Sequence, residues 1–131
     1  MIAVDTNLLV RIVVNDDPAQ TAASIRVLQG DAPVYLLNSV LQELVWVLEG
    51  SYQVERHHLA AAIEAIIETP NILLESELTR EVVDWYRAGM DIADAIHLAG
   101  AASGCETLVT FDKDFIRKAK GKTSCVVRKP G

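Results

Sequence analysis

Short apolar runs alternate along the chain with longer stretches in which apolar residues recur every three or four positions. In residues 55–68, for example, Leu59, Ile63, Ile66 and Ile67 fall on one face of a helix. Glycine or proline follows most of the periodic stretches, where it would end a helix. The apolar runs predict strands over residues 1–4, 34–38, 72–75, 107–111 and 124–128, and the periodic stretches predict helices over residues 18–28, 39–50, 55–68, 78–88, 91–103 and 114–119.

Two of these helices carry signals at their first residues. Pro18 suits the first position of a helix that runs to Leu28, because its missing N–H has no partner there in any case. Ser39 is followed three residues later by Gln42, which predicts a capping box at the start of the next helix.

The alternation of short strands and helices predicts an α/β fold around a central, mainly parallel sheet. The strands are apolar at successive positions, as strands are when helices cover both faces of a parallel sheet. The chain has 131 residues, half of them hydrophobic, and contains no internal repeat or linker. These features predict a single domain over residues 1–131.

Two acids lie at carboxyl ends of predicted strands, where the sites of open α/β sheets gather. Asp5 follows the first strand and Asp112 follows the fourth. Each has a simpler interpretation as a helix cap, since aspartate side chains often accept the first N–H groups of a helix. Taken singly, each acid favours the capping interpretation.

Two further acids lie on predicted helices. Glu43 is surrounded by Leu41, Leu44 and Val45, and a carboxylate in an apolar setting costs free energy unless something compensates it. Asp94 falls in the first turn of a helix that Asp91 would cap, where a negative charge also suits the helix dipole. If these acids converge with those at the strand ends, a divalent cation such as Mg²⁺ or Mn²⁺ would relieve their repulsion.

Four segments in order along the chain, DTNLL, LQELVW, DIADAIHLA and TFDKDF, resemble the PIN domain family, and most closely its VapC-type toxins. The resemblance runs from Met1 to about Val127. It implies a three-layer α/β/α sandwich and Mg²⁺- or Mn²⁺-dependent endonucleolytic cleavage of RNA. It also implies a cognate VapB-type antitoxin and a homodimer, for which the helices of residues 39–49 and 55–68 are candidate contacts. The catalytic and metal-binding residues that it implies are Asp5, Glu43, Asp94 and Asp112, with Asp91 and Asp114 as accessory acids.

Other polar and aromatic residues have weaker claims to a role. The side chains of Thr6, Asn7 and Thr110 could hold the carboxylates in place or serve turns and caps. His97 shares a helix face with Asp94, although a core or surface histidine is the simpler interpretation. Trp46 and Trp85 are most simply core residues.

The net charge of −6 is unevenly distributed. Residues 113–131 hold seven basic residues and one acid, a net charge of +6, whereas residues 1–112 carry −12. A basic segment on an acidic body permits RNA binding, and Arg117, Lys118, Lys120 and Lys122 are candidate phosphate contacts. The alternatives are an ordinary solvated face or a contact with the antitoxin.

Two other classes of protein remain open from the residues alone. A phospho-acceptor receiver domain would need an aspartate after the third strand, where Glu75, Ser76 and Glu77 stand instead. A non-catalytic binding module would use the same acids as helix caps. No apolar run is long enough to cross a bilayer, no signal peptide is evident, and Cys105 and Cys125 suit free thiols, so we expect a cytoplasmic protein.

Overall fold

The computed structural model describes residues 1–131 and divides them into two compact units. Unit 1 comprises Met1–Glu77 and unit 2 comprises Leu78–Gly131. Each unit contains its own parallel strands and its own helices, so the α/β class that the sequence predicts is confirmed, and the architecture is consistent with a PIN-like fold. No helix has the length and apolar character needed to cross a membrane.

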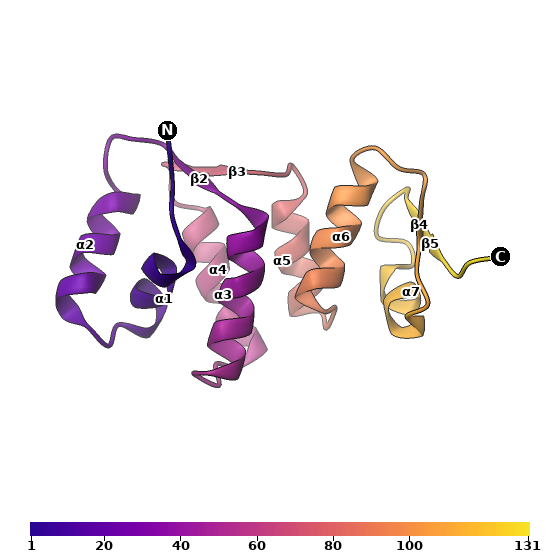
Figure 1. Cartoon of the computed structure of the whole chain (residues 1–131), viewed down its shortest axis with the longest axis horizontal. Coiled ribbons are helices and arrows are strands. Elements are labelled where there is room, and N and C mark those ends of the chain that lie inside the picture. Colours follow the sequence, from indigo (N-terminus) through magenta and orange to yellow (C-terminus); the bar gives the residue numbers. More distant parts are fainter. The chain divides into compact units, whose positions relative to one another are not determined.

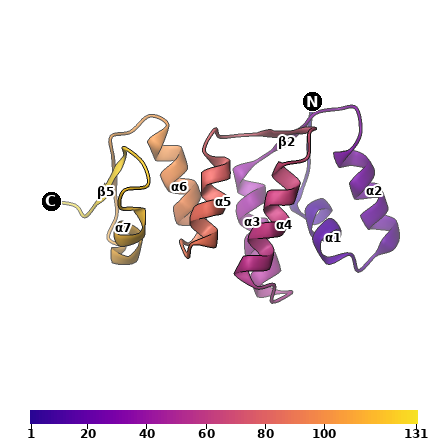
Figure 2. The same ribbon diagram turned by 180° about the vertical axis from the view of Figure 1, so that it is seen from behind.

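Unit 1 consists of three short strands and four helices, and Figures 1 and 2 show the helices grouped on one side of the strands. The strands pair in the order β1-β2-β3, all parallel, so their carboxyl ends share one edge of the sheet. The elements in chain order are β1 (Ile2–Ala3), α1 (Thr6–Val14), α2 (Pro18–Leu28), β2 (Val34–Leu36), α3 (Asn38–Gly50), α4 (Arg56–Ile67) and β3 (Ile72–Leu74).

The sheet of unit 1 buries one face of β2 and β3, whereas both residues of β1 are exposed. Val34 is paired with Ile72, and both side chains are buried. At the next register position Ala3, Tyr35 and Leu73 lie side by side, and Ala3 and Leu73 are exposed. Because side chains alternate between faces, one set packs under the helices while the other faces outward. The prediction that the strands are buried on both faces is therefore wrong within this unit.

Helices α3 and α4 supply much of the core of unit 1. Their apolar positions recur at helical spacing and point to one side, which is what places them together in the interior. The residues that they bury include Leu41, Leu44, Val45, Leu48, Leu59, Ile63, Ile66 and Ile67.

Unit 2 has two parallel strands and three helices, in the order α5 (Thr79–Arg87), α6 (Ile92–Ala102), β4 (Thr107–Val109), α7 (Lys113–Ala119) and β5 (Val126–Arg128). Figure 1 shows α5 beside α6, and α7 next to the strand pair. Here too one strand face is open, because Val109 and Val126 are exposed. The core is formed by Val82, Tyr86, Ile92, Leu98 and Phe115, among others.

Most predicted elements are present, with two differences. Helix α1 is absent from the predicted elements, although the capping interpretation of Asp5 allows a helix to begin directly after it. The capping box at Ser39 and Gln42 is also wrong, since α3 begins at Asn38 and has no side-chain cap of its own. Glu75 provides the partner instead, because its Oε2 accepts the N–H of Asn38 at 2.5 Å.

Candidate functional site

Asp5 connects the first strand to α1 and is exposed. Its Oδ1 accepts the backbone N–H of Thr6 at 2.7 Å, so the capping interpretation is correct. No hydrogen bond involves Oδ2, which leaves one carboxylate oxygen available for a ligand. Capping and ligand binding are therefore compatible at this residue, because each uses a different oxygen.

The hydroxyl of Thr6, the residue after Asp5, is buried and has no hydrogen-bond partner. Thr6 is only 3% exposed, and an unpartnered buried hydroxyl is rare in folded proteins. The predicted support of Asp5 by Thr6 therefore comes from the backbone N–H and not from the side chain.

The carboxyl edge of the unit 1 sheet gathers more polar groups than sequence reasoning identified. Asp5 follows β1, Asn38 follows β2, and Glu75 follows β3. Glu75 is absent from the site residues predicted from the sequence, because there it serves only to argue against a receiver domain. The signal that could have identified it is its position, since an acid directly after a parallel strand shares the edge with the others.

Glu43 lies on the exposed side of α3, flanked by the buried residues Leu41, Leu44 and Val45. The interpretation that it is a carboxylate in an apolar setting is wrong, because the apolar neighbours turn inward while Glu43 faces outward. Trp46, one turn further along, is 54% exposed, so its assignment to the core is also wrong. Trp85 is buried, as predicted.

Asp94 lies in the first turn of α6 and is half-buried. Its backbone N–H donates to Oδ1 of Asp91 at 3.0 Å, so Asp91 is the predicted N-cap. Burial raises the pKa of the Asp94 carboxyl, and the negative charges of Asp91, Asp112 and Asp114 raise it further. His97 acts in the opposite direction on this pKa but is itself exposed. Negative charge therefore accumulates around Asp94.

Asp112 is the N-cap of α7, and its Oδ1 accepts the N–H groups of Asp114 at 2.9 Å and Phe115 at 3.0 Å. Its own N–H donates to the hydroxyl of Thr110 at 3.1 Å, so Thr110 has the supporting role suggested for it. As at Asp5, no hydrogen bond involves the second carboxylate oxygen. Three hydrogen bonds, two accepted by the carboxylate and one donated by the backbone N–H, therefore fix the orientation of Asp112.

Asp114 differs from the other acids of this cluster. It forms ion pairs with Arg117 and, at 3.0 Å, with Lys118. Hydrogen bonds from these two side chains lower the pKa of the Asp114 carboxyl. Its charge is thus compensated by two cations, whereas neither Asp94 nor Asp112 forms an ion pair.

In neither unit are three or more His, Cys, Asp or Glu side chains placed to hold a metal ion together. The donor chemistry of unit 2 nevertheless fits a hard divalent cation. Asp94 and Asp112 offer only carboxylate oxygens, and the pKa of Asp94 is raised first by burial and then by the neighbouring aspartates. Mg²⁺ and Mn²⁺ prefer such ligands and retain several waters, so two protein carboxylates suffice as anchors.

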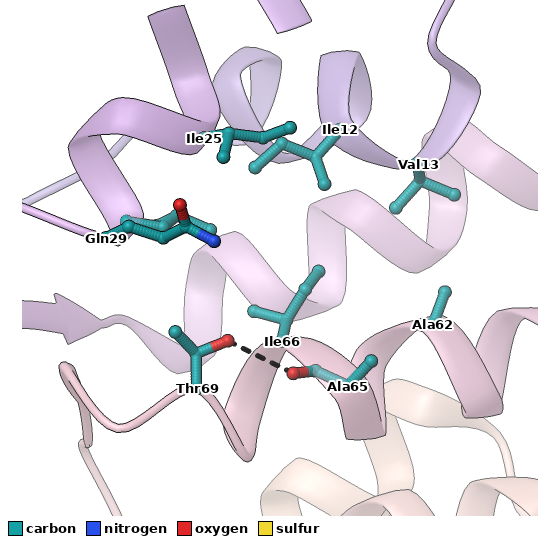
Figure 3. Close-up of a pocket in the computed structure, with 9 residues that line it drawn as sticks. Ile12, Val13, Ile25, Gln29, Ala62, Ala65, Ile66 and Thr69 are labelled. Atoms are coloured by element: carbon teal, nitrogen blue, oxygen red, sulfur yellow. Dashed lines mark hydrogen bonds between the residues drawn. The ribbon is translucent and has the colours of Figure 1, made fainter. Parts of the chain in front are cut away.

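A separate hollow of about 370 Å³ lies within unit 1, as Figure 3 shows. No acid lines it, and the hydroxyl of Thr69 is already bound to the Ala65 carbonyl at 3.1 Å. We call it the apolar groove; it is lined from α1, α2 and α4 and the residues after them by Ile12, Val13, Ile25, Leu28, Gln29, Ala62, Ala65, Ile66 and Thr69.

Comparison with known families gives one match, to the PIN domain, over residues 2–121. The matched region covers most of the chain, spans both units and contains all four acids singled out above. No curated protein and no solved structure matches the chain significantly.

Proposed function

Because the chain belongs to the PIN domain family, whose members are generally nucleases, we propose that it is a metal-dependent endoribonuclease. The observation that carries the proposal is the family match over residues 2–121, within which Asp5, Glu43, Asp94 and Asp112 are all present. Since the match spans both units, the proposal treats residues 1–131 as one nuclease domain.

The proposed catalytic carboxylates have different supports in the structure. Asp112 is oriented by α7 and by Thr110, and Asp94 is fixed by its position in the first turn of α6. A bound Mg²⁺ or Mn²⁺ would supply a water of lowered pKa and would stabilise charge on phosphate oxygens. Asp94 and Asp112 would hold this ion in unit 2. The family resemblance adds Asp5, whose Oδ2 forms no hydrogen bond, to the proposed ligands. Glu43, being exposed, suits the orientation of a water.

A cleavage assay with a labelled single-stranded RNA tests this proposal. The purified chain should cut the RNA internally with Mg²⁺ or Mn²⁺, and EDTA should stop it. Asp5→Asn should remove cleavage without unfolding the protein, because asparagine caps a helix about as well as aspartate. Cleavage that continues unchanged in EDTA would contradict metal dependence, and a complete lack of cleavage on varied RNAs would favour the binding-module alternative.

We further propose that this nuclease is the VapC-type toxin of a toxin–antitoxin pair and that it acts in the cytoplasm. The two free cysteines, Cys105 and Cys125, are compatible with a reducing compartment. The apolar groove of unit 1 is our candidate contact for a VapB-type antitoxin. Its aliphatic walls, including the exposed Ile25, would accept apolar side chains of a partner helix.

Co-purification from the native operon tests the partner. Ala65→Asp places a charge in the apolar groove and should abolish recovery of a small second chain. Ala23→Asp makes the same change on an exposed position of α2 that does not line the groove, and recovery should persist. Equal recovery with both variants would contradict the groove as the contact.

We also propose a homodimer through the exposed side of α3, one of the two helices that the sequence suggests as contacts. The apolar faces of α3 and α4 lie in the core of unit 1, so they are not available to a second copy. The exposed Trp46 is the large apolar side chain that α3 leaves on its surface. Sedimentation should show dimer at micromolar concentration and a shift toward monomer in Trp46→Ala; a monomer at every concentration would contradict the proposal.

A further inference from the structure

Four basic side chains of unit 2 line a single small hollow of about 270 Å³. We call it the lysine pocket; its charged lining is Arg117, Lys118, Lys120 and Lys122, and its remaining lining includes Trp85 and Met90. No acidic residue lines it. Its volume lies just below the range usual for pockets that take a whole organic ligand, so it suits a small charged group.

The four basic residues are not equivalent. Arg117 and Lys118 are both paired with Asp114, and Lys118 also donates to the carbonyl of Gly89 at 2.7 Å. Lys118 is therefore a tether between α7 and the turn after α5. Lys120 and Lys122, by contrast, form no ion pair or hydrogen bond through their side chains, and both residues are exposed.

A tight turn brings these two lysines to the same pocket. The N–H of Lys122 donates to the carbonyl of Ala119 at 3.1 Å, which closes a four-residue turn. Lys120 has φ −58° and ψ 123°, and Gly121 has φ +76°. These are the angles of a type II turn, whose third position favours glycine because φ is positive there. The Lys-Gly-Lys sequence thus encodes the placement of both charges.

Lys120 and Lys122 bring two unpaired ammonium groups to one pocket, where like charges repel and a bound anion would relieve this repulsion. We propose that the lysine pocket binds a backbone phosphate of single-stranded RNA, with Lys120 and Lys122 as the contacting residues and Arg117 as a third donor. The ligand identity rests on the proposed function, but the phosphate chemistry rests on the pocket. Phosphate contacts position RNA without reading its sequence, so binding at this pocket is sequence-independent.

Binding is measured separately from cleavage, by fluorescence anisotropy of a labelled oligouridylate in EDTA. In Lys120→Gln/Lys122→Gln the slope of log affinity against log salt should fall by about 0.7, since the pocket holds one phosphate and each phosphate contact contributes about 0.7 for single strands. The matched control is Arg80→Gln/Lys129→Gln, which removes the same charge from exposed positions of unit 2 outside the pocket. Its slope should stay close to that of the parent.

Two further measurements complete the test. Lys120→Arg/Lys122→Arg should retain the parent slope, which distinguishes lost charge from a disturbed turn. Inorganic phosphate should compete with the oligouridylate in the parent but not in Lys120→Gln/Lys122→Gln. Equal slopes for the pocket variant and its control would overturn the proposal. Because no metal is present, a failure of cleavage leaves this result intact, and a failure of binding leaves the nuclease proposal standing.

Discussion

Units 1 and 2 differ in the sign of their net charge and in how their acids are grouped. Unit 1 has 3 basic and 11 acidic residues, a net charge of −8, and contains no lysine. Unit 2 has 9 basic and 7 acidic residues, a net charge of +2. In unit 1 the candidate acids Asp5 and Glu43 are exposed, whereas in unit 2 Asp91, Asp94, Asp112 and Asp114 crowd together and shift the pKa of Asp94.

This difference shows that two acids with the same local role can lie in different electrostatic surroundings. Asp5 and Asp112 have the same local role, each following a strand and capping a helix. Asp112 also contributes, after burial and Asp91, to the raised pKa of Asp94. The electrostatic strain that a cation would relieve is therefore visible within unit 2.

The largest expected effect is a difference in cleavage rate between substitutions of Asp112, the N-cap of α7, and Asp114, in its first turn. Asp112→Asn should lower the RNA cleavage rate by at least about 100-fold, since it removes a carboxylate proposed to hold the metal ion that would stabilise charge on phosphate oxygens. Asp114→Asn should keep most of the activity, because Asp114 is already committed to Arg117 and Lys118. Single-turnover rates measure both, with circular dichroism as a check of folding. Comparable losses in the two variants would remove the distinction between a compensated and an uncompensated acid.

Substitutions of acids in the two units should weaken metal binding to different extents. Asp94→Asn should weaken Mn²⁺ binding by at least about tenfold, whereas Glu43→Gln should weaken it less, because an exposed glutamate that orients a water is not an anchor. Isothermal titration calorimetry gives both affinities. The reverse ranking would show that unit 1 supplies the main ligands.

Without metal, Asp94→Asn should raise the melting temperature by a few degrees near about pH 7 and leave it unchanged near about pH 3. The sign follows from the raised pKa of Asp94 in the folded state. Below the unfolded pKa both states are protonated; as pH rises toward the folded pKa, the unfolded state ionises more readily and stability falls. Scanning calorimetry in EDTA at both pH values measures the change, and a lower melting temperature at neutral pH would mean that Asp94 is stabilised as an anion.

The smallest effect concerns two buried threonines of unit 1. Thr6→Val removes a hydroxyl without a partner and should leave the free energy of unfolding unchanged or raise it by up to about 1 kcal/mol. Thr21→Val removes a hydroxyl that donates to the Arg11 carbonyl at 2.9 Å and should lower it by about 1 kcal/mol. Urea unfolding compares the two. A loss of stability in Thr6→Val would mean that its hydroxyl is bound in solution.

Periodicity predicted the elements well because apolar positions on helices such as α4 determine which face is buried. The missed helix α1 shows the limit of this signal. Its run TNLLVRIVV is short and largely apolar, and such runs suit a strand or a helix equally until the cap at Asp5 is considered. The capping box failed for a related reason, since the partner of α3 is Glu75, which lies 37 residues from Asn38.

The candidate site was predictable in part. The caps at Asp5, Asp91 and Asp112 follow from local sequence, because caps act over a few residues. The exposure of Glu43 and Trp46 could not be predicted from neighbouring residues alone, since a helix surrounded by apolar letters still has an outer side. The lysine pocket likewise required the turn geometry at Lys120 and Gly121 and the packing of α7 against the turn at Gly89.

The confinement of all five lysines to residues 113–129 has a practical consequence for biophysical work on this protein. Amine-reactive dyes, cross-linkers and sensor-chip chemistries can attach only there or at the N-terminal amine. Such conjugates would neutralise the ammonium groups proposed to bind RNA, and immobilised molecules would present unit 2 to the support. Maleimide coupling through the exposed Cys105 leaves every lysine free, while burial shields Cys125 and raises the pKa of its thiol.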